Sequence, residues 1–182
     1  MSATDTTKAI PSSTDCERSA LPTERATDPM AVLKGMYAAE SRYLAAGGPG
    51  KADFGALAPF FAPDVVLVQA EGLPYGGIWR GHEGLERFFL EMSRTWEVFD
   101  MVSQEFLATE SPLVVRTHVH ARARGTGREL DFPILQTITV DEGRISEVHP
   151  FYWDTAAIAR ACTHAGSAGC RLEAATSWVS GL

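Results

Sequence analysis

The second half of the chain, from residue 97 to residue 153, is divided into long runs with the pattern of β-strands, and this constrains the fold more than any other feature. Short segments rich in Gly, Pro, Ser and Asp separate the runs, which cover residues 97–109, 112–124, 129–140 and 144–153. Runs bounded by turn residues in this way predict strands that are joined by hairpins. We therefore expect a four-stranded antiparallel meander.

Helical patterns come before this sheet. Asp28-Pro29 is typical of a helix start, with Asp as the N-cap and Pro at the first helical position, and the glycines after residue 46 end that helix. Asp53 caps a short second helix, and a third helix follows Gly81. Two strands, 65–70 and 78–80, lie between the second and third helices, and a last helix covers 156–162. Helices first and a meander afterwards predict an α+β fold.

The composition is that of one globular domain. The chain has 182 residues, of which 45% are hydrophobic, and we expect a domain over residues 29–162 between a disordered tail at 1–28 and a second tail at 163–182. A net charge of −7 argues against a nucleic-acid partner, and no apolar run is long enough to predict a membrane span.

Two kinds of absent motif bear on location and chemistry. The three cysteines (Cys16, Cys162 and Cys170) form no C-x-x-C pair, which favours free thiols in a reducing, cytoplasmic location. The sequence also has no Gly-rich phosphate loop and no nucleophile elbow. We expect chemistry without a cofactor and without a metal.

The order of elements resembles the superfamily of nuclear transport factor 2, ketosteroid isomerase and the SnoaL-like polyketide cyclases over residues 30–160. Five segments carry the resemblance: Tyr37 to Ala39, Phe61 to Val66, Gly76 to Gly84, Asp141 to Ile145, and Phe151 to Asp154. The resemblance implies a cone-shaped, bent antiparallel sheet that wraps around the N-terminal helices and encloses an apolar pocket. Members of this superfamily include isomerases, dehydratases, cyclases, epoxide hydrolases and non-catalytic proteins, so the resemblance indicates the fold more than the reaction.

Strand parity selects candidate pocket residues, because alternate side chains of a strand point to opposite faces of the sheet. In the run 129–140 the even positions are apolar, as at Phe132, with the single exception of Gln136. A buried amide needs hydrogen-bond partners, so Gln136 is either a satisfied structural residue or a partner for a ligand. SnoaL-like cyclases carry a pocket histidine near this position, and Gln cannot serve as a proton-transfer base.

The same rule predicts that His149 points inward. Its parity is that of Ile145, Phe151 and Trp153, which are all apolar. Regular alternation places Tyr152 on the opposite face, although a bulge at Pro150 would reverse this. Desolvation would keep an inward imidazole neutral and able to accept a proton near neutral pH.

The first helix supplies further candidates. Tyr37, Glu40 and Leu44 share one helical face. In ketosteroid isomerases a tyrosine of this helix donates to the substrate oxyanion, which makes Tyr37 and Tyr43 candidates, with aromatic packing as the alternative. A carboxylate on a core face is costly unless it is paired or protonated, so we expect Glu40 to have a shifted pKa.

The first strand lacks the acid of the ketosteroid isomerases. An alignment from Phe61 places Gln69 where those enzymes carry their Asp general base, and Gln69 cannot abstract a proton. Glu71, two residues further along, is a candidate substitute, with a solvent-exposed position as the alternative.

These residues predict a cofactor-independent acid–base enzyme, an isomerase, cyclase or dehydratase, that acts on a hydrophobic small molecule such as a natural product. The expected site combines proton-transfer groups, oxygen-binding groups and an apolar wall: His149, Glu71, Glu40, Tyr37, Gln136, Gln69, Tyr75, Trp79, Phe132, Trp153 and Tyr43. The alternative is a non-catalytic domain of the same fold that binds small molecules or dimerises, because both base positions of the isomerases lack their acid.

We predict a homodimer that forms through the outer face of the sheet. Arg116, His118, His120 and Arg122 share one strand face, which indicates a solvated or partner-facing surface rather than a metal site or a catalytic site. Folds of this kind leave a sheet face uncovered, and symmetric pairing is a common way to cover it. Light scattering at tens of micromolar protein should give the mass of a dimer, and a monomer mass would contradict the prediction.

Overall fold

The computed structural model describes residues 28–163 and confirms the α+β class. Its elements are α1 (Pro29–Ala45), the short 3-10 helices η1 (Phe54–Ala56) and η2 (Ala58–Phe60), β1 (Phe61–Gln69), β2 (Gly77–Arg80), α2 (Gly81–Thr95), β3 (Trp96–Ala108), β4 (Leu113–Ala123), β5 (Glu129–Asp141), β6 (Arg144–Tyr152) and α3 (Thr155–Cys162). The predicted tails lie outside the described residues, apart from Asp28 and Thr163. No helix within residues 28–163 is long and apolar enough to cross a membrane.

Local signals in the sequence explain where the helices begin. The side chain of Asp28 accepts a hydrogen bond from the backbone N–H of Met30 at 3.0 Å, as expected of the N-cap of α1. Asp53 accepts one from the N–H of Gly55 at 2.8 Å and starts η1 in the same way. Both predicted caps are confirmed.

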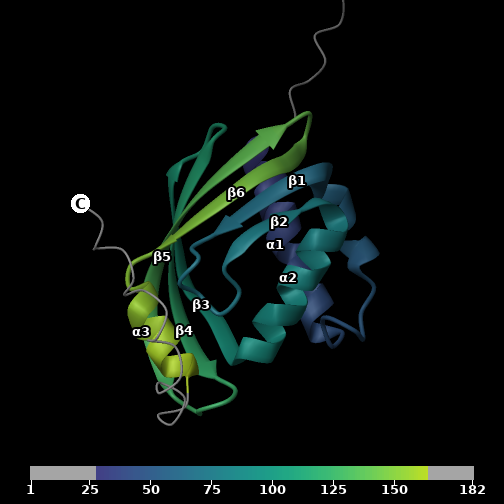
Figure 1. Ribbon diagram of the computed structural model, residues 1–182. Helices are drawn as coiled ribbons and strands as arrows, with labels where there is room; N and C mark the ends of the chain where they lie inside the picture. The colour runs from purple at the N-terminus through teal and green to yellow at the C-terminus, as the bar shows by residue number, and fades with distance from the viewer. Residues whose placement is uncertain (1–27, 164–182) are drawn as a thin grey trace, which may run out of the picture.

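The six strands form one open sheet in the order β2-β1-β6-β5-β4-β3. The predicted meander from β3 to β6 is confirmed, with antiparallel pairing at every step. β1 instead pairs with β6 in parallel, so the sheet as a whole is mixed. The sheet curves around α1 and α2, and α3 lies apart from both helices (Figure 1).

Bulges bend the edge strand β3. Its pairing with β4 shifts at three places, and at each of them β3 has one more residue than its partner. The extra residues include Val102 and Leu107, which explains why these two large apolar side chains are exposed. Bulges increase local twist and bending, so they help the sheet to curl around the helices.

Two apolar clusters hold the helices against the concave face of the sheet. The larger one joins α1, β1 and α2 to the ends of β4, β5 and β6 and includes Leu33, Val65 and Leu85. The smaller one joins the loop between β1 and β2 to β4, β5 and α3, through Tyr75 and Ile158 among others. A cavity remains between the two clusters.

The loop between β1 and β2 is closely packed and fixes Tyr75. Its backbone turns through hydrogen bonds from Leu73 N–H to the Ala70 carbonyl and from Gly76 N–H to the Leu73 carbonyl, both at 3.0 Å. The indole N–H of Trp79 donates to the Tyr75 carbonyl at 3.1 Å. A Cβ at Gly76 would lie 2.5 Å from the Ala70 carbonyl oxygen, which is too close.

We predict that Gly76→Ala destabilises the fold by about 1–3 kcal/mol, because the atoms that a methyl group would meet belong to the backbone and cannot move aside. Gly72→Ala is the matched control in the same loop, since its Cβ would meet nothing nearer than 3.6 Å. Urea unfolding of both variants measures the difference. Equal stability of the two variants would show that the loop adapts.

Candidate functional site

A cavity of about 460 Å³ lies between the concave face of the sheet and the helices α1 and α2. This volume falls within the range of sites for small molecules. The lining is mainly apolar, with side chains from both helices and from all strands but β2, among them Met36, Leu67, Phe88, Met92, Phe99, Ile134 and Val148.

The mouth of the cavity is marked by the lining residues that are exposed to solvent. These residues come from the end of α1, from β3 and from the end of β4: Leu44, Gly47, Glu97, Met101 and Arg124. The cavity therefore opens to solvent between the C-terminal end of α1 and the start of β3.

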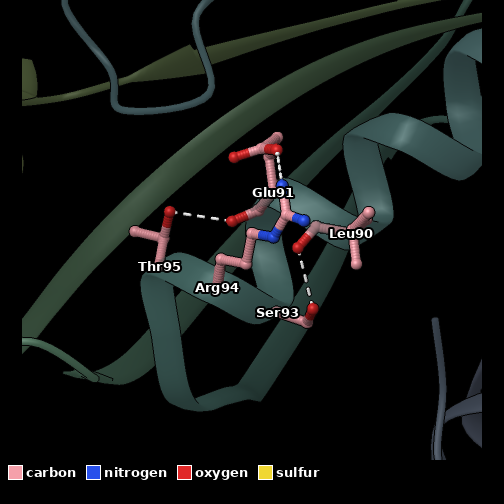
Figure 2. A network of polar contacts seen from close by, with 5 residues as sticks. All are labelled: Leu90, Glu91, Ser93, Arg94 and Thr95. Carbon is pink, nitrogen blue, oxygen red and sulfur yellow. Dashed lines mark hydrogen bonds and ion pairs between the residues drawn. The ribbon is translucent and has the colours of Figure 1, made fainter. Parts of the chain in front are cut away.

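The C-terminal turn of α2 forms one side of this mouth and is held by polar contacts. Figure 2 shows Ser93 and Thr95 donating to the carbonyls of Leu90 and Glu91, both at 2.8 Å. Arg124 joins the turn to β4, because its Nε donates to the Ser93 carbonyl at 2.9 Å and its terminal nitrogen donates to the Trp96 carbonyl at 3.0 Å. These contacts hold Ser93 and Trp96 at the wall of the cavity.

Glu40 places a carboxyl group in this apolar space. It projects from α1, lines the cavity with its neighbour Tyr37, and takes part in no hydrogen bond or ion pair within residues 28–163. Burial raises the pKa of Glu40 from the usual 4.5 to about 7. Burial also raises the pKa of Tyr37, the charge of Glu40 raises it further, and the side chain of Gln104 lowers it. At neutral pH Tyr37 is a protonated hydrogen-bond donor beside a carboxyl group that titrates.

Polar side chains also lie on the sheet opposite α1. Gln136 faces the cavity from the middle of β5, and Thr117 faces it from β4, where its buried hydroxyl has no hydrogen-bond partner among the described residues. Gln69, at the end of β1, is only 3% exposed, and its Oε1 likewise has no partner in the described part of the chain. Uncompensated buried groups of this kind are costly, which makes them candidates for ligand contacts.

Tyr152 extends this polar surface, and Tyr75, predicted as a wall residue, is buried behind it without lining the cavity. Tyr152 lines the cavity from β6, and the hydroxyl of Tyr75 donates to its hydroxyl at 3.4 Å. Burial raises the pKa of Tyr75 to about 12, with a smaller contribution from Cys162, while the neighbouring Tyr152 and Trp96 lower it. Both phenols are therefore protonated at neutral pH.

Tyr43, a predicted oxyanion donor, and two predicted wall residues lie in the core behind the cavity. Tyr43 packs edge-on against Phe54 and Phe89. Phe132 packs against Tyr152 at a ring distance of 6.0 Å, and Trp79 holds the Tyr75 loop. These residues support the wall, but they do not line the cavity.

The expectation that His149 points inward is wrong. β6 contains one extra residue, Ser146, because Thr139 and Val140 of β5 pair with Glu147 and Ile145. This bulge reverses the alternation, so Val148, Pro150 and Tyr152 face the cavity.

His149 therefore lies on the outer face of the sheet. Its Nε2 is 2.8 Å from Oε1 of Glu147, and its side chain is 35% exposed. Trp153, with the same parity, is 85% exposed and forms no wall. Glu71 is exposed in the turn after β1 and does not line the cavity.

The basic residues of the outer face have acidic neighbours. His118 and His120 lie 3.9 Å and 3.2 Å from Oδ1 of Asp131, and Arg122 lies 3.1 Å from Glu97. In the part of the chain that the structure describes, no three His, Cys, Asp or Glu side chains are placed to hold a metal ion. The surface character predicted for His118 and His120 fits this placement.

The model of the SnoaL-like domain matches residues 41–148, which is more than half of the chain. The chain belongs to the SnoaL-like family. The resemblance seen in the order of its elements is thereby confirmed. None of the curated proteins matches the chain.

Solved structures show the same fold in other proteins. A nuclear transport factor 2-like protein from Burkholderia xenovorans LB400 has a TM-score of 0.65 and 23% identity, over 75% of this SnoaL-like chain and 96% of its own. TerC, co-crystallised with polyporic acid, has a TM-score of 0.61 and 18% identity over 75% and 98%. A SnoaL-like polyketide cyclase, described as putative, from Shewanella denitrificans OS-217 has a TM-score of 0.51 and 16% identity over 68% and 89%.

The cavity contains polar residues that sequence reasoning missed. Thr117 lies on the face of β4 opposite the basic residues and is not among the predicted site residues, and Trp96 lies where α2 changes to β3. Regular alternation predicts Tyr152 on the outer face; a bulge does reverse this, but it lies at Ser146 and not at Pro150. The two adjacent polar residues Ser146 and Glu147 in β6 are compatible with a bulge but do not require one.

The raised pKa of Glu40 makes the stability of the SnoaL-like domain depend on pH. Between the unfolded value of 4.5 and the folded value of about 7, the folded chain holds a proton that the unfolded chain has released. The contribution of this group is therefore full below the unfolded pKa and is lost as the pH rises through the folded pKa.

We predict that raising the pH from about 5 to about 8 lowers the free energy of unfolding by up to about 3 kcal/mol more in the native protein than in Glu40→Gln. The Gln variant has the same shape and no proton to release, so it isolates this group. Urea unfolding at both pH values measures the difference. Parallel pH dependence of the two proteins would show that Glu40 titrates as an ordinary carboxyl group.

Proposed function

We propose that this protein is a cofactor-independent acid–base enzyme that isomerises, cyclises or dehydrates a hydrophobic small molecule. The observation that carries the proposal is the Glu40 carboxyl group, which lines an apolar cavity without a partner in the described residues and has a pKa of about 7. A general base or acid is most effective when its pKa lies near the working pH.

Glu40 and Tyr37 suit the movement of a proton next to a carbonyl group. The Glu40 carboxylate takes a proton from the carbon beside the carbonyl, the C–H electron pair becomes the C=C bond of an enolate, and the π pair of the carbonyl moves onto its oxygen. Tyr37 hydrogen-bonds to that oxygen while its charge develops, which stabilises the transition state in a cavity with few competing dipoles. Return of the proton from Glu40 to another carbon completes an isomerisation.

The relatives support a hydrophobic ligand. One of the similar structures is described as a putative SnoaL-like polyketide cyclase, and another, TerC, was co-crystallised with polyporic acid. The mainly apolar lining supports the same class of compound. Natural-product biosynthesis is the setting that we propose.

The rival function is binding without turnover. It is favoured by Gln69, which stands where ketosteroid isomerases carry their Asp base and cannot take a proton. It is favoured also by the outward position of His149, because Glu40 is then the one carboxyl or imidazole group that is shielded from solvent in the lining formed by residues 28–163.

We also propose a homodimer and a cytoplasmic location. Pairing through the outer face of the sheet is supported by the cross-strand neighbours Leu135 and Phe151, two exposed apolar side chains next to the basic strand face. The cytoplasmic location is supported by the cysteine pattern of the sequence.

We predict that Glu40→Gln lowers turnover by roughly 10²- to 10⁴-fold, because it removes the proton-transfer group and keeps the shape of the side chain. Glu71→Gln is the matched control, since Glu71 lies outside the cavity. The assay incubates the protein with small-molecule extract in D₂O and follows deuterium incorporation and product formation by mass spectrometry.

Loss of exchange in Glu40→Gln alone supports the enzyme. Exchange that survives in Glu40→Gln shows that another group moves the proton. Compounds that bind the native protein and leave unchanged and undeuterated identify the binding function instead.

A further inference from the structure

The wall formed by β1 and β6 contains a hydrogen-bonding pair that proton transfer by Glu40 does not use. Tyr152 lines the cavity from β6, and Gln69 lines it from β1. Leu67 pairs with Val148 in the parallel ladder, so Gln69, two residues on, lies beside the same-face residues Pro150 and Tyr152. The two polar groups are neighbours on one wall.

Tyr152 has a hydrogen-bond donor to spare. Tyr75, itself 1% exposed, donates its hydroxyl proton to the Tyr152 oxygen at 3.4 Å. A phenol that accepts in this way keeps its own proton for another acceptor. Burial raises the pKa of Tyr152 well above its usual value, the neighbouring Tyr75 adds to this, and a hydrogen bond with the side chain of Gln69 lowers it. The net rise leaves the phenol neutral, so it keeps a proton that it can donate.

Gln69 has the complementary need. Its Oε1 has no hydrogen-bond partner within residues 28–163, although the side chain is almost fully buried. Rotation about the terminal bond of a Gln side chain is soft, so the amide can turn its oxygen toward the cavity. An acceptor left unpaired in such a place costs free energy until a ligand supplies a donor.

A hydroxyl group satisfies both residues at once, because it accepts from Tyr152 and donates to Gln69. A ketone or an ether accepts from Tyr152 but leaves Gln69 unpaired. An ammonium group pairs with Gln69 alone and adds a charge to a mainly apolar wall. A carboxylate brings an acceptor only, again with a charge.

We propose that Tyr152 and Gln69 form an anchoring subsite for a neutral hydroxyl group, phenolic or alcoholic, on the hydrophobic ligand. The subsite rests on the proposed function only in that the cavity holds the substrate. It lies on the sheet, and Glu40 and Tyr37 lie on α1, so an anchored ring is held between the anchor and the proton-transfer group.

The test compares three probes of one shape: 2-naphthol, 2-methoxynaphthalene and naphthalene, with dissociation constants from equilibrium dialysis. For the native protein we expect 2-naphthol to bind most tightly and naphthalene least, with about a two- to tenfold step for each hydrogen bond. Equal binding of 2-naphthol and naphthalene, or no binding of any probe, overturns the subsite.

Two variants assign the hydrogen bonds to residues. Gln69→Leu should weaken 2-naphthol to the affinity of 2-methoxynaphthalene and leave the other two probes unchanged. Tyr152→Phe should bring both oxygenated probes down toward naphthalene. A native preference for 2-naphthol that persists in both variants overturns the assignment.

Matched controls separate this subsite from the rest of the cavity. Tyr43→Phe removes a buried hydroxyl that does not line the cavity, and Gln136→Leu removes the amide of β5; neither should change the ranking of the probes. A Gln136→Leu variant that loses the preference moves the anchor to β5 and overturns the proposal. Melting temperatures confirm that each variant is folded.

Glu40→Gln distinguishes failure of the anchor from failure of the enzyme. We expect this variant to keep the preference for 2-naphthol and to lose proton exchange. Exchange that survives in Glu40→Gln, together with a preference that depends on Tyr152 and Gln69, rejects the proposed chemistry and leaves the anchor standing. Exchange that depends on Glu40, without any preference for 2-naphthol, rejects the anchor and leaves the proposed chemistry standing.

Discussion

The parallel pairing of β1 with β6 joins the first half of the chain to the meander. In the sheet order β2-β1-β6-β5-β4-β3, this ladder is what connects β1 and β2 to the strands β3–β6. The pairing also places Gln69 next to the cavity-facing residues of β6. It positions α2, which follows β2 in the chain, on the concave face of the sheet. The sheet side of the cavity, the position of α2 and the pairing of Tyr152 with Gln69 all depend on this one ladder.

Bulges determine which side chains of the sheet face the cavity. A strand turns every second side chain to one face, and a single extra residue exchanges the faces for everything that follows. Ser146 does this in β6, where it brings Tyr152 in and turns His149 out. In β3 the same device places Val102 and Leu107 outside the regular pattern and bends the edge of the sheet.

The chemistry of the cavity follows from where water is excluded. Glu40 has a pKa of about 7 because burial disfavours its charged form and no cation in the described residues offsets the cost. Burial also raises the pKa values of Tyr37 and Tyr152, so both phenols keep their protons. The cavity therefore has hydrogen-bond donors on two sides and one carboxyl group, Glu40, that ionises near neutral pH. Weak dipoles act strongly in such surroundings.

The sequence by itself determined the elements and their order, because caps, turns and alternation are local signals that tertiary contacts here do not override. It also determined the inward face of α1, since a 3.6-residue period set by Tyr37, Glu40 and Leu44 does not depend on other elements. The even face of β5 with Gln136 follows equally from a regular strand.

Only the tertiary structure decided the composition of the site beyond these residues. The parallel partner of β1 and the extra residue of β6 arise from contacts between strands, which no local pattern encodes. They turned His149 and Trp153 to solvent and set Tyr152 beside Gln69. An irregularity in the pairing of two strands transfers the side chains that follow it from one face of the sheet to the other. The alternating pattern of a single strand does not show where this happens.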